Sequence, residues 1–164
     1  MKKSKRKQII RMEGDPILEM VAEECSPDVF EREGIGNRLF SIMKRLPNAQ
    51  GLAAPQLGLS KRAVIVRWKG ECTVMYNPKI KCRGIYWRRS VETCLSCYHI
   101  YVVHRPGWLV VQYEDKDGMQ YTEFCWYRKA RIVMHEVDHL NGKCINRGKE
   151  KGCYANAGNV SGLT

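Results

Sequence analysis

The sequence of 164 residues has no long run of apolar side chains. A helix that spans a membrane needs roughly 18 apolar residues in succession, so no membrane span is expected. The basic start is like the first part of an export signal, but the apolar stretch that must follow is missing, because Ile9 and Ile10 give way to Arg11 and Glu13. These absences favour a cytoplasmic protein without a membrane partner.

The eight cysteines lack the regular spacing of a structural zinc site. Only Cys94 and Cys97 form a C-x-x-C pair, and a zinc ribbon requires a second pair. Without an export signal the thiols are expected to be reduced, and one or more of them can bind a metal. On a strand, Cys97 would point to the side opposite Cys94. The rest are interpreted as core fillers or free surface thiols: Cys25, Cys72, Cys82, Cys125, Cys144 and Cys153.

Acidic residues are few for a chain this basic: 17 Asp and Glu stand against 28 Lys and Arg, which gives a formal net charge of +11. Such a balance can indicate a nucleic-acid partner, and the ribosome is one such surface. However, no array of interleaved basic and aromatic residues and no known nucleic-acid motif is visible. We therefore favour a basic N-terminal arm and solvated faces, keep a ribosome contact as an alternative, and expect no specific DNA partner.

The length predicts a single domain, and the sequence contains no internal repeat. Three parts are expected. Residues 1–14 form a basic, flexible N-terminus, residues 15–146 form the folded domain, and residues 147–164 form a polar, glycine-containing tail without a long closing helix.

Local patterns within the domain predict a mixture of helices and strands. After a partly helical lead-in over 15–25, Ser26-Pro27-Asp28 is typical of a helix start, and helical spacing continues to Leu46, weakened by Gly34 and Gly36. Strands are predicted at 63–66, at 73–76 with an end at Asn77-Pro78, once or twice within 79–91, and in a hairpin that joins 108–113 to 119–124 through Asp117-Gly118.

The strongest chemical signal is His-Glu-x-x-His at residues 135–139. Residues four apart on a helix share a face, so His135 and His139 can bind one metal ion, with Glu136 beside them as a candidate general base. Apolar spacing predicts a helix that begins near Tyr127, and Asn141-Gly142 predicts its end. From these residues alone, a chance histidine pair on a half-buried helix remains an alternative.

A second segment, residues 48–58, is small, glycine-bearing and non-periodic. Such a segment lets a backbone approach a ligand closely. Within it, Gln56 is a candidate amide donor toward a developing negative charge.

Three segments carry a family resemblance through their order and spacing: Gly51-Leu52-Ala53-Ala54-Pro55-Gln56, Glu92-Thr93-Cys94-Leu95-Ser96 and His135-Glu136-Val137-Asp138-His139-Leu140. Together they resemble peptide deformylase, the metallohydrolase that removes the formyl group from formyl-methionyl nascent peptides. The resemblance extends from about Asp15 to Gly142. It implies a compact α+β domain in which antiparallel sheets surround a central metal-binding helix.

The resemblance also implies the reacting groups. Cys94, His135 and His139 would be the ligands of one divalent ion, often iron(II), which zinc, nickel or cobalt can replace. Glu136 would move the proton, and the side-chain amide of Gln56 with the backbone N–H of Leu95 would stabilise the oxyanion.

Further residues would surround this centre. Gly51 would offer its backbone to the peptide, and Thr93 and Tyr101 would lie beside it. Glu92 and Asp138 would hold a ligand or the helix in place, with Arg105 as their partner. The methionine side chain would enter an apolar pocket lined by Ile132, Val133 or the Leu52 region.

The sequence departs from the family pattern at several positions. Ala49 and Gln50 replace glycine and an apolar residue, Met134 replaces glutamine, and the segment after Ser96 lacks its usual proline and arginine. Thr93 replaces a glycine, which would cost about 1–2 kcal/mol if that position had a positive φ. The missing closing helix points to a short, phage-type form.

Two alternatives remain at this point. A catalytically weak homologue could keep the metal as a structural staple and bind the ribosome, although such a protein would need neither Glu136 nor Gln56. A zincin-type protease shares His-Glu-x-x-His, but its third ligand usually lies downstream.

Overall fold

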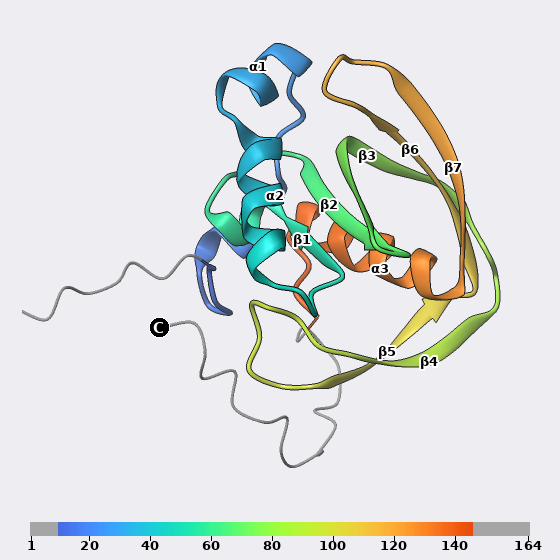
Figure 1. Ribbon diagram of the computed structural model, residues 1–164. Helices are drawn as coiled ribbons and strands as arrows, with labels where there is room; N and C mark the ends of the chain where they lie inside the picture. The colour runs from blue at the N-terminus through green and yellow to red at the C-terminus, as the bar shows by residue number, and fades with distance from the viewer. Residues whose placement is uncertain (1–9, 146–164) are drawn as a thin grey trace, which may run out of the picture.

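The computed structural model describes residues 10–145, which form an α+β fold built mainly of antiparallel sheet, as predicted. Figure 1 shows helix α3 (Tyr127–Leu140) crossing the centre of the molecule. The larger sheet has the order β1-β2-β3-β6-β7, and β4 pairs with β5. The strands are β1 (Gly51–Ala53), β2 (Ala63–Trp68), β3 (Glu71–Arg83), β4 (Trp87–Glu92), β5 (Tyr101–Pro106), β6 (Trp108–Glu114) and β7 (Gln120–Trp126).

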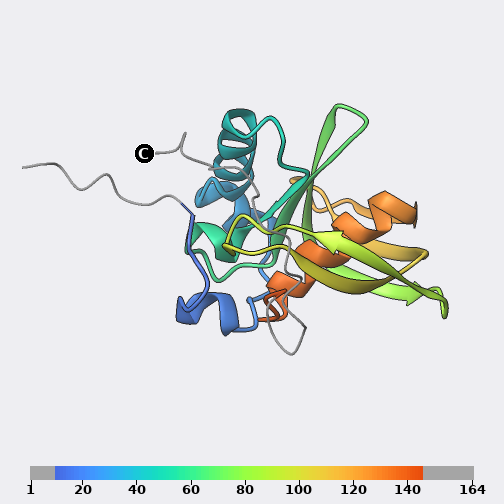
Figure 2. The ribbon, with the colours of Figure 1, turned by 90° about the horizontal axis from the view of Figure 1, so that it is seen from below.

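Alternation along β2 explains how helices cover both faces of the sheet. Val64 and Val66 point into the core that α3 shares with β6, whereas Ala63 and Ile65 pack with α2 (Ile35–Arg45). Successive strand residues point to opposite faces, so a continuous apolar run fits a strand buried on both sides. As Figure 2 shows, α3 lies between the larger sheet and the β4–β5 pair. The fold thereby brings the histidine helix against two sheets.

The helix predicted from Ser26 to Leu46 is two helices. Helix α1 (Pro27–Arg32) ends before Gly34, whose φ of 60° is left-handed, and α2 begins at Ile35. Ser26 makes no side-chain capping bond. Glycine adopts a left-handed conformation at little cost, so Gly34 turns the chain where the sequence only indicated a weak helix. The lead-in contains one short 3-10 helix, η1 (Pro16–Glu19).

The prediction that Asn77-Pro78 ends a strand is wrong. Strand β3 continues to Arg83 through a register shift between Tyr76 and Lys79, with Asn77 at a φ of 47°. A bulge tolerates proline because the bulged residue makes no ladder hydrogen bond. The Asn77 side chain fixes the bulge by accepting from the Cys25 N–H and donating to Glu114. The predicted hairpin is confirmed as β6 and β7.

Residues 10–14, which the sequence assigned to the flexible N-terminus, pack against the fold. The Arg11 N–H donates to the Gln56 carbonyl at 2.7 Å, and the Glu13 N–H donates to the Ser96 carbonyl at 2.7 Å. The remaining predictions for the N-terminal arm and the tail fall on residues 1–9 and 146–164, outside the described part. Among residues 10–145, no helix has the length and apolar content to cross a membrane.

An aromatic and basic surface is present although the sequence showed no such array. Ring centroids of Trp108 and Phe124 lie 5.4 Å apart, those of Phe124 and Trp126 4.8 Å, and those of Trp126 and Tyr127 6.0 Å. The Arg88 guanidinium covers the Tyr127 ring at 5.3 Å. The array is invisible in sequence because β4, β6, β7 and the first residue of α3 contribute to it together, and Arg88 on β4 and Trp108 on β6 are distant in the chain from the other three residues. We call these five residues the aromatic–arginine surface.

Candidate metal centre

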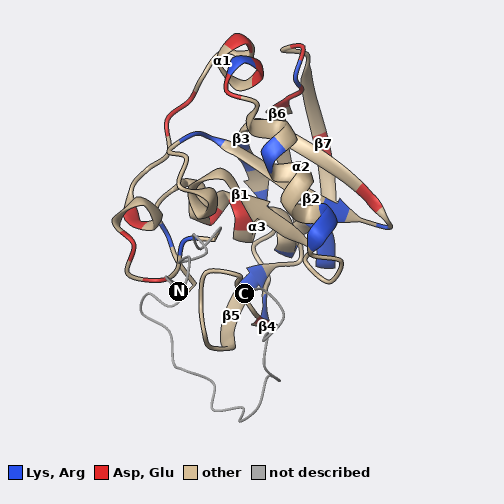
Figure 3. Ribbon diagram, turned by 60° about the vertical axis from the view of Figure 1, so that its left-hand side comes forward, with Lys and Arg blue, Asp and Glu red and all other residues tan. Residues whose placement is uncertain are grey.

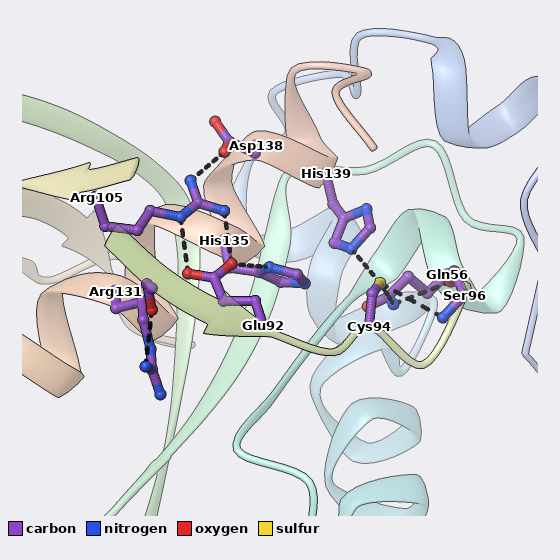
Figure 4. Close-up of polar contacts among 10 residues, drawn as sticks. Gln56, Glu92, Cys94, Ser96, Arg105, Arg131, His135, Asp138 and His139 are labelled. Atoms are coloured by element: carbon purple, nitrogen blue, oxygen red, sulfur yellow. Dashed lines mark hydrogen bonds and ion pairs between the residues drawn. The ribbon is translucent and has the colours of Figure 1, made fainter. Parts of the chain in front are cut away.

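Three side chains from two segments converge at the end of β4. The ligand atoms of Cys94, His135 and His139 all lie within 4.8 Å of one another. Cys94 stands in the loop that follows β4, and both histidines project from one face of α3 (Figure 4). The Cys94 Sγ and His139 Nε2 are 3.1 Å apart. The sequence motif and the upstream cysteine are therefore parts of a single cluster.

His135 is oriented by a buried ion-pair network. Its Nδ1 contacts Glu92 Oε2 at 3.0 Å, which leaves Nε2 to face the cluster. Arg105 binds both Glu92 oxygens, each at 2.9 Å, and also reaches Asp138 on α3. The predicted partnership of Arg105 with the two carboxylates is confirmed. A carboxylate behind a ligand histidine fixes its tautomer and ring orientation.

This network sets the protonation of its members. Burial raises the pKa of Glu92, but hydrogen bonds from His135 and Arg105 outweigh it and lower that pKa to about 2. Burial lowers the pKa of His135, yet the contact with Glu92 raises it overall. Burial holds the pKa of His139 well below its usual value. His139 is thus a neutral imidazole, the form that binds a metal.

Glu136 lies beside the cluster with one oxygen that has no partner. Its side chain is 4% exposed, and among the described residues nothing bonds its Oε2. Burial raises the pKa of Glu136 to about 7. A group that exchanges its proton near neutral pH suits general acid–base chemistry. Gly51 leaves room for this carboxyl group, because a Cβ on Gly51 would stand 2.7 Å from the Glu136 Cδ.

Hydrogen-bond donors surround the Cys94 sulfur. Gln56 is held by the Ala53 N–H, which donates to its Oε1 at 2.8 Å, so that Nε2 points at Ser96 Oγ (3.0 Å) and Cys94 Sγ (3.6 Å). The Ser96 N–H also donates to the sulfur at 3.4 Å. Leu95 follows Cys94 directly. Ser96 was missed as a site residue, although a polar residue two positions after a candidate ligand was a signal for it.

The sequence placed Cys97 on the side opposite Cys94, and this is wrong. The segment is a turn, closed by the Cys97 N–H on the Cys94 carbonyl at 3.1 Å, and the Cys97 side chain packs against the cluster that contains Cys94. This contact and burial raise the pKa of the Cys94 thiol well above its usual value. A bound cation would reverse that direction, because metal coordination lowers a thiol pKa. The strand argument failed because β4 ends at Glu92.

Two residues expected to lie beside the substrate, Tyr101 and Thr93, have surroundings other than those predicted. Tyr101 is 1% exposed and packs with Val103, Ile145 and Cys94, so it supports the cysteine loop from within the core instead of facing a substrate. Thr93 is exposed and does not have a positive φ, so the expected strain is absent.

The donor set fits a divalent transition metal. One sulfur and two imidazole nitrogens are ligands that zinc and iron accept, and three protein ligands leave a position for water or substrate. The partnerless Glu136 oxygen beside this open position fits a site that handles a proton, whereas a closed structural site has four ligands.

A sequence profile described as polypeptide deformylase matches residues 7–151. The chain belongs to the polypeptide deformylase family. It is 34% identical over 130 residues to a peptide deformylase of Treponema pallidum (strain Nichols), covering 79% of this chain and 80% of the relative. Identity is 35% over 138 residues with the peptide deformylase of Dictyoglomus thermophilum, covering 83% and 88%.

Solved structures agree with the fold. A class I type b peptide deformylase from Acinetobacter baumannii superposes with a TM-score of 0.78 at 30% identity, over 84% of this chain and 95% of that one. The Thermotoga maritima peptide deformylase gives 0.77 at 30% identity, over 83% and 92%. The chain is therefore a metal-dependent hydrolase that removes N-terminal formyl groups from formyl-methionyl peptides.

Proposed function

We propose that Cys94, His135 and His139 hold one divalent ion, iron(II) in the cell, at the centre of this reaction. Such an ion supplies Lewis-acid chemistry, since it polarises a carbonyl and lowers the pKa of a water. Zinc, nickel or cobalt would replace it in vitro. The convergence of the three ligand atoms beside a partnerless Glu136 oxygen is the observation that carries the proposal.

The surrounding residues transfer the proton and stabilise the negative charge of the reaction. Glu136 accepts a proton from the water that attacks the formyl carbon and gives it to the amine nitrogen as the C–N bond breaks, which yields formate and a free N-terminus. The Gln56 Nε2 and the Leu95 N–H donate hydrogen bonds to the oxyanion of the tetrahedral intermediate. The Gln56 Nε2 lies close to the Cys94 sulfur, and Leu95 follows Cys94 in the sequence. Both donors are therefore next to the place that the formyl oxygen would occupy.

The peptide would lie along β1. Among the described residues β1 pairs only with β2, so the other edge of the strand that begins at Gly51 can receive an extended peptide. One related structure, from Acinetobacter baumannii, has Met-Ala-Ser bound, and this is the product expected from a formylated peptide. Exposed Thr93 borders the same path, and Ile132 supplies apolar surface for the methionine side chain.

Formate release from formyl-Met-Ala-Ser tests the proposal. Protein purified without oxygen and supplied with iron(II) or nickel(II) should release formate, and Cys94→Ala should neither bind the ion nor release formate. No release from protein that holds one ion per chain would overturn it. In that case the catalytically weak homologue, which the buried Glu136 and Gln56 argue against, would be the better interpretation.

A contact with the ribosome is proposed from the aromatic–arginine surface. Exposed ring faces next to guanidinium groups are the features with which proteins stack on unpaired bases and bind phosphates. Trp126→Ala and Tyr127→Ala should lower co-sedimentation with purified ribosomes and leave formate release unchanged. Unaltered co-sedimentation would remove this surface from consideration. Because nascent chains are the substrate, the location proposed is the cytoplasm.

A further inference from the structure

The turn that begins at Cys94 ends in a second thiol. Residues 94–97 form a turn that is closed by the Cys97 N–H, which donates to the Cys94 carbonyl at 3.1 Å. In a four-residue turn the first and last Cα atoms lie less than about 7 Å apart. A disulfide joins residues whose Cα atoms are about 4.4–6.8 Å apart. The turn therefore holds the two cysteines, whose thiols are free, at a separation that a disulfide can bridge.

Cys97 lies close to the metal centre without being part of it. Its side chain packs against the buried cluster that contains Cys94 and Tyr101. Within residues 10–145, however, the ligand atoms that all lie within 4.8 Å of one another belong to Cys94, His135 and His139. The Cys97 sulfur is thus a neighbour of a ligand, and it can react without first leaving an ion.

The two cysteines differ in their access to solvent. Cys94 is 7% exposed, and the Ser96 N–H and the Gln56 Nε2 lie against its sulfur. Cys97 is only half-buried. An oxidant that arrives from solvent therefore meets the Cys97 sulfur first, and Cys94 is the adjacent thiol that can resolve the product.

The charges around the turn favour a small, uncharged oxidant. The connection from β4 to β5, residues 93–100, has no Lys, Arg, Asp or Glu, and it is tan in Figure 3. The Glu13 N–H donates to the Ser96 carbonyl, which brings an acidic residue beside the turn. A negative charge at this place repels an anionic oxidant such as glutathione disulfide, whereas hydrogen peroxide carries no charge.

We propose that Cys97 is a redox-active residue that bonds to Cys94 in the presence of peroxide and thereby releases the metal ion reversibly. The inference rests on the proposed function, in which Cys94 is a ligand. The Cys97 sulfur attacks hydrogen peroxide, so that an S–O bond forms, the O–O bond breaks and water leaves. The Cys94 sulfur then attacks the Cys97 sulfur, and hydroxide leaves as a second water with the thiol proton or one from solvent. Two thiols are thus oxidised to a disulfide, and one peroxide is reduced to two waters.

The disulfide would empty the metal centre and protect its cysteine. A thiolate is the form of cysteine that binds a metal, so an ion would keep only the two imidazoles once Cys94 is paired. Reduction by a dithiol would return the ligand. Oxidation of a single thiol proceeds instead to sulfinic and sulfonic acids, which such reductants do not reverse.

Zinc-loaded protein tests the inference, because zinc itself has no redox chemistry. The tryptic peptide of residues 90–116 contains Cys94, Cys97 and no other cysteine. After treatment with hydrogen peroxide and then iodoacetamide, this peptide from the wild type should lack two hydrogens and carry no label. Zinc, measured with a coloured chelator, should be released in step with that change. A phosphine reductant and fresh zinc should restore both thiols and the bound ion.

Two variants localise the effect. Cys97→Ser should form no such disulfide, and its release of zinc should be at least about tenfold slower, because the buried Cys94 is then the only sulfur at the centre. Any zinc that this variant loses should not be restored by reduction. Cys82→Ser is the matched control, since Cys82 is an exposed thiol on β3 and its loss should leave both measurements unchanged. Thermal unfolding verifies that each variant is folded.

The outcomes separate this inference from the proposed function. A wild-type peptide that keeps both labels after peroxide, or equal zinc release from the wild type and Cys97→Ser, would overturn the inference. Untreated protein that binds no zinc would overturn the metal ligands of the proposed function. Protein that binds zinc and forms the disulfide, yet releases no formate from formyl-Met-Ala-Ser, would overturn the proposed reaction and support the role of Cys97.

Discussion

Glu136 shows how surroundings give a common side chain a special role. Burial raises its pKa to about 7, and one of its oxygens has no partner among the described residues. A surface glutamate with the same neighbours in sequence would remain ionised and solvated. The sequence motif names the residue, but the reactivity depends on the removal of water around it.

Glu136→Gln should separate metal binding from turnover. The substitution keeps the shape of the side chain and all three proposed ligands, so one ion per chain should remain by elemental analysis. Loss of the proton-transfer group should lower kcat at least about 100-fold. Near-normal formate release would refute the general-base assignment.

Cys125 should be inert, in contrast to Cys82, which is exposed. It is fully buried on β7, and burial raises its pKa to about 11. The thiol therefore stays protonated in the folded protein up to about pH 10, and only unfolding exposes it. Mass spectrometry after iodoacetamide treatment at pH 8.5 should find Cys82, which is exposed, alkylated and Cys125 unmodified. Comparable rates at both cysteines would contradict this.

At the scale of elements, β1 and α3 can approach closely because Gly51 on β1 has no side chain. A Cβ at Gly51 would overlap the Glu136 carboxyl group. Gly51→Ala should therefore displace Glu136 and lower kcat/KM by about tenfold or more, since small displacements of a catalytic group are costly. Thermal unfolding should show a folded protein. As a matched control, Gly107→Ala meets open space and should retain full activity.

Arg105 joins β4, β5 and α3, because it binds Glu92 and Asp138 from a position on β5. Arg105→Leu would leave Glu92 as a buried, unpaired carboxylate, which typically costs about 3 kcal/mol or more. Urea denaturation at neutral pH should show a correspondingly lower free energy of unfolding. A loss below about 1 kcal/mol would mean that the network positions His135 without contributing to stability.

For the whole molecule, the metal is expected to stabilise the folded state. The ligands come from a loop and a helix that are distant in the chain, so the unfolded chain cannot bind the ion equally well. Free metal at 100 times its dissociation constant should add about 2.7 kcal/mol, or about 5–10 °C in Tm. Chelation should remove this gain in differential scanning calorimetry. Cys94→Ala should show no such shift, and an equal shift in that variant would place the stabilising metal elsewhere.

The sequence by itself determined the chemical groups of this protein. His135, Glu136 and His139 lie within one helical turn, where spacing alone defines geometry. Gln56 and Cys94 followed from motif resemblance. The hairpin of β6 and β7 was also predictable from local sequence, because its strands and its Asp-Gly turn are contiguous in the chain.

Only the tertiary structure decided how distant segments meet. It placed Cys97 beside Cys94, buried Tyr101, carried β3 through Pro78 and assembled the aromatic–arginine surface from three strands and the start of α3. These outcomes depend on turn closure, bulges and strand pairing between segments far apart in sequence. Local periodicity carries no information about such long-range contacts, since it reports only which face of an element is apolar.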